Sequence, residues 1–213
     1  MDQALTVTRG PDERIIALAG NPNVGKSTVF NELTGLNQHT GNWPGKTVAS
    51  AQGPYTFHGV RYTLVDLPGT YSLMAHSAEE EVARDFLCFA GADAAVVVCD
   101  ATCLERNLNL VLQTLEITSQ VVVCVNLMDE AKKKQITLNL PLLSRKLGVP
   151  VVGASARSGQ GLTQLMEQVE AITRREPGAP YSIPYDPPIQ QAMDRLQPLL
   201  APHLPPCVPA RWA

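Results

Sequence analysis

The spacing of apolar residues predicts an alternation of buried strands and amphipathic helices. The continuous apolar runs at 93–100 and 120–127 have the length of strands that are covered on both faces. Between them, apolar residues recur at helical spacing from Leu104 to Leu115. In the same way, the sequence predicts strands at 14–20, 47–59, 60–69, 93–100, 120–127 and 149–155. It predicts helices at 78–91, 102–118, 141–148, 161–175 and 189–200, and one after residue 25 that carries Val29, Phe30 and Leu33.

This order of elements predicts an α/β fold. Continuous apolar strands that alternate with helices are typical of a mostly parallel sheet, here of six strands, with helices on both faces. The strands 47–59 and 60–69 meet at His58-Gly59, a turn signal that makes them an antiparallel edge pair. Ligands bind at the carboxyl ends of the strands in such sheets, so candidate site residues are sought there.

The composition of the chain changes after Arg175. Residues 1–175 are expected to form one domain, and a proline-rich connector begins at 176. Within 176–213 one amphipathic helix is expected at 189–200, and a single helix cannot build a domain. We therefore expect 176–213 to be a linker and the start of a truncated helical domain, or a segment that packs back on the main domain.

Composition and charge narrow the class of protein. The chain has 213 residues, 45% of them hydrophobic, and a net charge of −3 without a basic cluster larger than Lys132–Lys134, so nucleic-acid binding is not expected. No apolar run reaches the roughly 20 residues that cross a bilayer, and the first residues lack the apolar core of a signal peptide. The five cysteines contain no C-x-x-C pair and are expected to be reduced thiols of a cytosolic protein.

The segment Gly20–Ser27 fits the phosphate-loop pattern G-x-x-x-x-G-K-[ST] between a predicted strand and a predicted helix. Its glycines allow the backbone to approach phosphate, and the helix N-terminus faces the anion. Lys26 is expected to reach the β- and γ-phosphates, and the Ser27 hydroxyl to bind Mg²⁺. The weaker alternative is a glycine-rich turn with an incidental lysine. The nucleotide-binding residues expected here are Gly20, Asn21, Asn23, Val24, Gly25, Lys26, Ser27 and Thr28.

Asp66–Gly69 forms a D-x-x-G motif after the third predicted strand. Asp66 is expected to hold Mg²⁺ through water, and the Gly69 N–H to contact the γ-phosphate. Alone the motif is a common turn, but its spacing from the phosphate loop favours the functional interpretation. The predicted switch II residues are Asp66, Pro68, Gly69 and Thr70.

Asn126–Asp129 forms an N-x-x-D motif after the fifth predicted strand. A carboxylate accepts hydrogen bonds from guanine N1–H and the 2-amino group, and a buried Asp129 would be left unpaired against adenine. The motif therefore predicts GTP and GDP as ligands, with Asn126 tying the loop together and reaching the base. The weaker alternative is a helix-capping Asn126 with Asp129 on the surface. Ser155 and Ala156, after the sixth strand, are assigned by position to the last base-contacting loop.

With these motifs in order, the chain resembles the P-loop GTPases of the translation-factor-related class, which implies a Ras-like G domain. The stretches "GNPNVGKSTVFNELTG", "GNWPGKTV" and "DLPGTYSL" are similar to the cytosolic G domain of the ferrous iron transport protein B family, over residues 14–175. Lys46 stands where that family usually has a hydrophobic residue. The resemblance implies that helical and polytopic membrane domains follow the G domain at the cytoplasmic face of the bacterial inner membrane.

The resemblance also implies roles for the segment after the first helix. Switch I is expected at Gly41, Asn42, Trp43, Pro44, Gly45 and Thr47. Thr47 would join Ser27 and Asp66 around Mg²⁺. Thr70 stands where small GTPases place a water-orienting glutamine, so slow hydrolysis is expected. Related GTPases use potassium, held by a phosphate-loop asparagine that matches Asn23, which gives a catalytic set of Lys26, Asn23, Thr47 and Gly69.

The sequence is compatible with three functions. The first is a GTP-hydrolysing domain that regulates or powers ferrous iron uptake. The second is an RNA- or ribosome-associated GTPase of the Era and TrmE type, which the acidic balance opposes. The third is a GTP-gated interaction module with negligible hydrolysis, which Thr70 keeps open. The sequence leaves self-association open.

Overall fold

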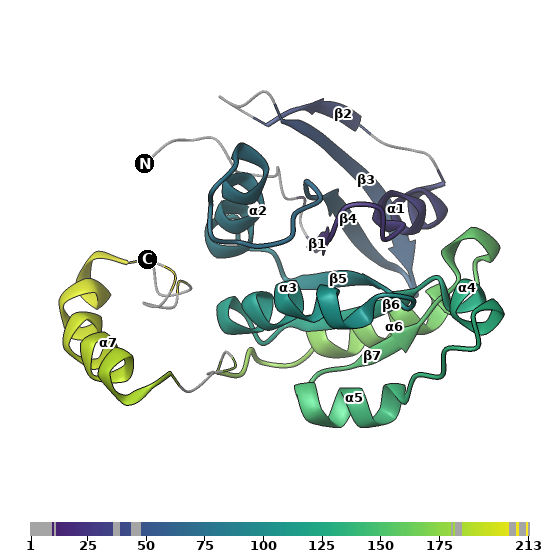
Figure 1. Ribbon diagram of the computed structural model, residues 1–213. Helices are drawn as coiled ribbons and strands as arrows, with labels where there is room; N and C mark the ends of the chain where they lie inside the picture. Colours follow the sequence, from purple (N-terminus) through teal and green to yellow (C-terminus); the bar gives the residue numbers. More distant parts are fainter. Residues whose placement is uncertain are drawn as a thin grey trace.

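A computed structural model describes residues 10, 12–35, 39–43, 48–179, 181, 185–204, 208 and 212. The described residues form one mixed sheet with the strand order β2-β3-β4-β1-β5-β6-β7 (Figure 1). The strands are β1 (Glu13–Gly20), β2 (His39–Asn42), β3 (Ala49–Phe57), β4 (Val60–Asp66), β5 (Ala94–Asp100), β6 (Val121–Asn126) and β7 (Val151–Gly153).

The predicted mostly parallel sheet is confirmed. β1 lies between β4 and β5 and is parallel to both, and β5, β6 and β7 continue the parallel part. β3 pairs antiparallel with β4, as the turn at His58-Gly59 predicts. The sheet has one strand more than the six expected, because β2 adds a short antiparallel edge on β3. Its sequence, HTGN, carries no apolar alternation, so the pattern of hydrophobic residues did not reveal it.

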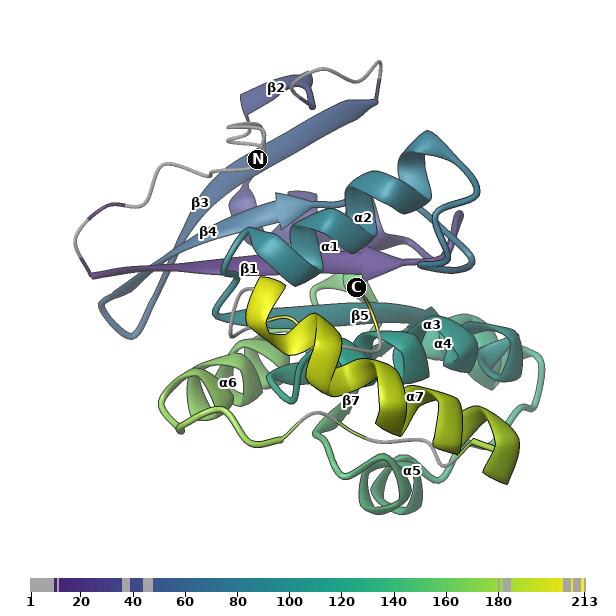
Figure 2. The same cartoon turned by 90° about the vertical axis from the view of Figure 1, so that its left-hand side faces the viewer.

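Helices cover both faces of the sheet (Figures 1 and 2). They are α1 (Lys26–Thr34), α2 (Ala78–Phe89), α3 (Leu104–Ile117), α4 (Met128–Lys133), α5 (Leu140–Leu147), α6 (Leu162–Thr173) and α7 (Pro187–Leu200). The short α4 was not predicted, because six residues rich in charge give no amphipathic stripe. Ser77 begins α2 by accepting a hydrogen bond from the Glu80 N–H at 3.2 Å, and the chain leaves that helix at Gly91, where φ is 68°.

Two apolar layers hold the helices on the sheet. In β1, Ile15, Ala17 and Ala19 face one layer, and Ile16 and Leu18 face the other, as alternation along a strand requires. The first layer contains buried residues of α2 and α3, among them Phe86, Leu110, Val111 and Leu115, and we call it the α2–α3 layer. The second contains residues of α1 and α6, including Phe30, Leu165 and Val169. The carboxyl ends of the parallel strands therefore meet at one rim between the layers.

The segment after α6 contacts the domain at its connector and near its end. The Tyr181 N–H donates to the Leu115 carbonyl at 2.8 Å, and the Ser119 hydroxyl donates to the Gly178 carbonyl at 2.9 Å. None of the α7 residues is buried, and Figure 1 shows α7 set apart from the sheet. Val208 is nevertheless buried in the α2–α3 layer, and Trp212 packs against it.

Among the described helices, none is long and apolar enough to cross a membrane. The longest of them, α3 and α7, have 14 residues each, against the roughly 20 that a bilayer requires.

Burial makes two of the cysteine thiols unreactive, which labelling can check. Burial raises the pKa of the Cys124 thiol to about 12 and raises the pKa of Cys99 further. Because the thiolate is the reactive form and the reagent must reach it, both should resist iodoacetamide at pH 8. Partial burial and Asp100 also raise the pKa of Cys103, but its thiol is exposed and should react. Peptide mapping by mass spectrometry should find Cys99 and Cys124 modified only after unfolding. Modification of either in the folded chain would contradict the buried placement.

Candidate nucleotide-binding site

The phosphate loop joins β1 to α1 through a tight turn. Gly20 ends β1 where an added Cβ would lie 2.8 Å from the Val98 carbonyl, so a side chain there would press against β5. Asn23 and Gly25 both have positive φ, 66° and 80°, and α1 begins at Lys26. A tight turn of this kind at a helix N-terminus is typical of backbone that binds an anion through its N–H groups.

A lysine, a hydroxyl and a carboxylate meet beside this loop. Lys26 is buried, with 8% of its surface exposed, and its Nζ pairs with Oδ1 of Asp66 at the end of β4. The Ser27 hydroxyl lies 3.2 Å from Oδ2 of the same carboxylate. A buried ammonium requires such a partner, and the hydroxyl and carboxylate are hard oxygen donors of the kind that Mg²⁺ prefers. Thr28, the residue after the motif, is exposed.

The D-x-x-G segment lies against the phosphate loop. The Thr70 N–H donates to the Gly20 carbonyl at 3.1 Å, and Thr70 itself is buried. An added Cβ at Gly69 would lie 3.3 Å from the Pro22 Cα, so the glycine allows the two backbones to approach closely. Pro68, between Asp66 and Gly69, is half-buried. The structure therefore brings the predicted switch II residues beside the predicted phosphate cradle.

Asn126 joins three loops through one buried side chain. Its Nδ2 donates to the Val24 carbonyl at 3.0 Å, and its Oδ1 accepts the Ala156 N–H at 3.0 Å. An added Cβ at Gly25 would lie 2.4 Å from Nδ2, so this contact needs the glycine. The amide orientation follows from its partners, because a carbonyl only accepts and an N–H only donates.

Asp129 and Ser155 lie beside Asn126 at the ends of β6 and β7. The Asp129 N–H donates to the Ser155 hydroxyl at 3.1 Å, and Ser155 is buried. The Asp129 side chain is exposed, which corrects the expectation of a buried carboxylate. The reason is its position in the first turn of α4, a short helix on the outer rim of the sheet.

Switch I is only partly described. Gly41 and Asn42 belong to β2, and Trp43 follows with 3% of its surface exposed. The Trp43 ring packs edge-on against Phe86 of α2, with ring centroids 5.4 Å apart. The predicted residues Pro44, Gly45 and Thr47 lie outside the described residues, so the role of Thr47 stays a prediction.

The two asparagines of the phosphate loop differ in their surroundings. Asn23 is exposed at the tip of the loop. Asn21 has 2% of its surface exposed, and its Oδ1 and Nδ2 have no hydrogen-bond partner within the described structure. Buried amides are normally paired, so these two atoms mark a place where the loop can take a polar partner.

Two supporting residues were not predicted. The Gln160 carbonyl accepts the Ser155 N–H at 3.0 Å and so holds the last loop. The side chain of Asn107 in α3 accepts the Asp100 N–H at 2.6 Å at the end of β5. A polar residue among the apolar positions of the predicted helix at 102–118 was the available signal for Asn107, whereas a backbone acceptor such as Gln160 leaves none.

The fold and the four gathered motifs define the class of protein as a P-loop GTPase G domain. A sequence model of the family described as "Ferrous iron transport protein B" matches residues 14–169. The chain belongs to this family, and the resemblance found in the sequence is confirmed.

Relatives and solved structures agree with this assignment. The Fe(2+) transporter FeoB of Salmonella typhimurium is 44% identical over 154 residues, which cover 70% of this chain and 20% of that protein. The FeoB of Escherichia coli K12 is 41% identical, over 76% of this chain and 21% of its own length. The chain thus spans about a fifth of these relatives.

The cytosolic domain of T. maritima FeoB in its GMPPNP form superposes with a TM-score of 0.87 at 35% identity, covering 93% of this chain and 78% of that one. Its GDP form I gives 0.87 at 35% identity, over 95% and 79%. The G domain of the same protein gives 0.71 at 42% identity, over 75% and 98%.

Replacing Gly25 with alanine should destabilise the chain more than replacing Gly148. Both glycines have positive φ, 80° and 73°, so each alanine brings about 1–2 kcal/mol of backbone strain. Only Gly25→Ala also places a Cβ against the Asn126 amide, while nothing lies within 4 Å at Gly148. We expect Gly25→Ala to lose about 2 kcal/mol more in the free energy of unfolding, measured in urea. Equal losses would show that Asn126 moves aside without cost.

Proposed function

We propose that this chain is the GTP-binding and GTP-hydrolysing cytosolic domain of a ferrous iron transporter, whose GTP cycle regulates or powers Fe(II) uptake. The observation that carries the proposal is the Asn126 side chain, which ties the phosphate loop at Val24 to the base loop at Ala156. A site in which these two loops are fixed relative to each other suits a ligand with both a phosphate chain and a base.

The residues beside the phosphate loop fit a nucleotide with Mg²⁺. Lys26 would contact the β- and γ-phosphates, and the loop N–H groups would surround them. Ser27, Asp66 and Thr47 would hold the ion, which supplies positive charge against the charge that develops on the phosphates. The proximity of Ser27 to Asp66 supports the Mg²⁺ assignment. The GDP and GMPPNP forms of the T. maritima protein support a guanine nucleotide as the ligand.

Base selection would rest on Asp129. Its carboxylate is free to accept two hydrogen bonds from guanine N1–H and the 2-amino group. Adenine lacks both donors. The Ala156 N–H, which was expected to contact guanine O6, instead donates to Asn126 Oδ1 in this structure. The hydrogen bond from the Asp129 N–H to Ser155 supports the role, because it fixes the start of α4 against the last loop.

Hydrolysis would depend on a backbone N–H group and a bound cation rather than on a glutamine side chain. Gly69 would present its N–H to the γ-phosphate, while Thr70, buried against Gly20, offers no amide to orient water. Asn23 stands exposed at the tip of the loop, where its side chain would help to hold potassium. The ion would supply positive charge between the α- and γ-phosphates.

The position of this domain in a longer protein is part of the proposal. Residues 1–175 would be the G domain on the cytoplasmic side of the inner membrane, and 176–213 the linker and first part of a helical domain. The apolar side chains Ile189, Leu196 and Leu199 are exposed on α7, which suits further helices packing there.

Removing the Asp129 carboxylate should abolish the preference for guanine. We expect wild-type protein to bind GDP far better than ADP, and Asp129→Ala to lose GDP affinity by about 100-fold or more, since two charge-assisted hydrogen bonds are lost. Isothermal titration calorimetry measures both, with Asp194→Ala on the distant α7 as the control. Equal affinity of the wild type for GDP and ADP would rule out the proposed selectivity.

Potassium should accelerate phosphate release through Asn23. We expect GTP turnover to be about tenfold or more faster in potassium than in sodium, and Asn23→Ala to remove the difference. A multiple-turnover phosphate assay at constant ionic strength compares the four conditions. Equal rates in all four would refute the potassium site, and tight GTP binding without turnover would favour a GTP-gated interaction module instead.

A further inference from the structure

The loop that follows Gly69 is held by groups that the GTPase motifs do not include. Leu73 is fully buried in the α2–α3 layer, whereas Tyr71 and Met74 are 44% and 60% exposed. One buried side chain does not fix the path of the backbone around it, because each backbone N–H and carbonyl still needs a partner.

Gln113 of α3 supplies the partners at the centre of this loop. Its Oε1 accepts the Leu73 N–H at 2.8 Å, and its Nε2 lies 3.3 Å from the Ser72 hydroxyl. Both ends of one amide are therefore used on two successive residues. The contact spans 40 positions of sequence, so it links the loop directly to a core helix.

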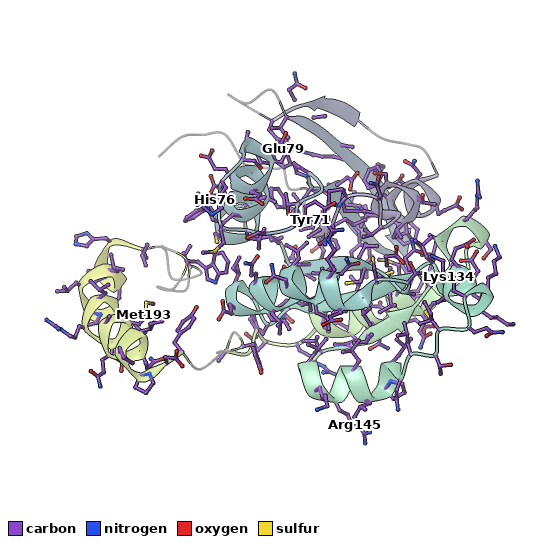
Figure 3. The ribbon with its side chains drawn as sticks, viewed as in Figure 1. Tyr71, His76, Glu79, Lys134, Arg145 and Met193 are labelled. Atoms are coloured by element: carbon purple, nitrogen blue, oxygen red, sulfur yellow. The ribbon has the colours of Figure 1, made fainter. Side chains whose placement is uncertain are left out.

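Two further side chains of α3 contact Tyr71, the residue before Ser72. Asn109 Nδ2 donates to the Tyr71 carbonyl at 3.2 Å, and the Arg106 guanidinium lies 4.3 Å from the centre of the Tyr71 ring. Tyr71 itself is labelled in Figure 3. Positions 106, 109 and 113 are spaced to share one face of a helix. We call these three residues the α3 clamp.

The loop is also fixed at its other end, where Thr70 bonds to Gly20 of the phosphate loop. The segment Thr70–Leu73 is thus held by Gly20 at one end and by the α3 clamp at the other, and Gly69 directly precedes it. A small displacement of Tyr71–Leu73 would therefore move the Gly69 N–H. In a site without a water-orienting glutamine, the Gly69 N–H does more to position the γ-phosphate. Small misplacements of such groups slow reactions strongly.

We propose that Gln113 is a positioning residue for GTP hydrolysis, acting through the backbone of residues 71–73. The proposal rests on the proposed GTPase function. The hydrogen bonds of Gln113 go to Leu73 and Ser72, outside the phosphate and base loops, so we expect it to affect the rate of the reaction and to leave GDP affinity unchanged. Asn109 contributes the same kind of restraint with a single hydrogen bond.

The test compares three variants of the full chain. Gln113→Leu keeps the size of the side chain and removes both hydrogen bonds. Gln113→Glu retains an acceptor for the Leu73 N–H and can accept from the Ser72 hydroxyl. Gln164→Leu is the matched control, because Gln164 is an exposed glutamine on α6, away from the loop. Single-turnover GTP hydrolysis, GDP affinity and thermal unfolding are measured for each.

We expect Gln113→Leu to lower the rate constant by about three- to tenfold while GDP affinity stays within about twofold. Gln113→Glu should recover most of the rate, and Gln164→Leu should match the wild type. An unchanged rate in Gln113→Leu would overturn the proposal. So would equal losses of rate and GDP affinity without recovery in Gln113→Glu, since those indicate a purely structural role.

A second variant tests the proposal if Gln113→Leu does not fold. Asn109 is exposed, so Asn109→Ala should remain folded and lower the rate constant by about two- to threefold with GDP affinity unchanged. An unchanged rate there would count against the α3 clamp. If the wild type hydrolyses GTP and neither variant slows it, only this inference fails. If the wild type binds no guanine nucleotide, the proposed function fails and this inference with it.

Discussion

The site depends on one contact that requires a glycine, the approach of the Asn126 amide to the backbone of the phosphate loop. The side chain passes where a Cβ on Gly25 would stand, bonds to the Val24 carbonyl and accepts the Ala156 N–H. Three loops from separate strands thus share one buried amide. Because a buried amide that loses a partner is costly, the loops cannot shift independently, and the distance between the phosphate loop and the loop at Ala156 is fixed.

A second restraint acts at the phosphate end, where Lys26 and Ser27 meet Asp66. An ammonium has three donors, so Lys26 can bond to the carboxylate and still direct hydrogens toward phosphate oxygens. The pair couples α1 to the end of β4, and the Thr70–Gly20 hydrogen bond makes the same connection through the backbone. The phosphate loop and switch II are therefore linked by charge and by hydrogen bonding at adjacent points.

Much of the fold and of the candidate site could be predicted, because the sequence signals for these elements are local. The run 93–100 is apolar enough to be a strand on its own, and G-x-x-x-x-G-K-S needs only its strand and helix neighbours to be recognised. What escaped prediction depends on contacts across the fold. β2 is a strand only because β3 offers it an edge. Asp129 is exposed because α4 lies on the rim, and α4 itself has no periodic signal. The role of Gln113 is set by a loop 40 residues away, which no spacing rule along the chain reveals.

α3 shows why such contacts matter beyond stability. One side of the helix, with Leu110, Val111 and Leu115, is buried in the α2–α3 layer against the sheet. Another side carries the α3 clamp on the loop after Gly69. A rigid helix that is packed on the sheet transmits the position of the sheet to the loop, because close-packed side chains resist small displacements. The phosphate loop extends from the same sheet at Gly20. The phosphate loop and the loop after Gly69 are thus both held in place by one rigid body, and the geometry of the candidate site follows from the packing of the core rather than from any single motif.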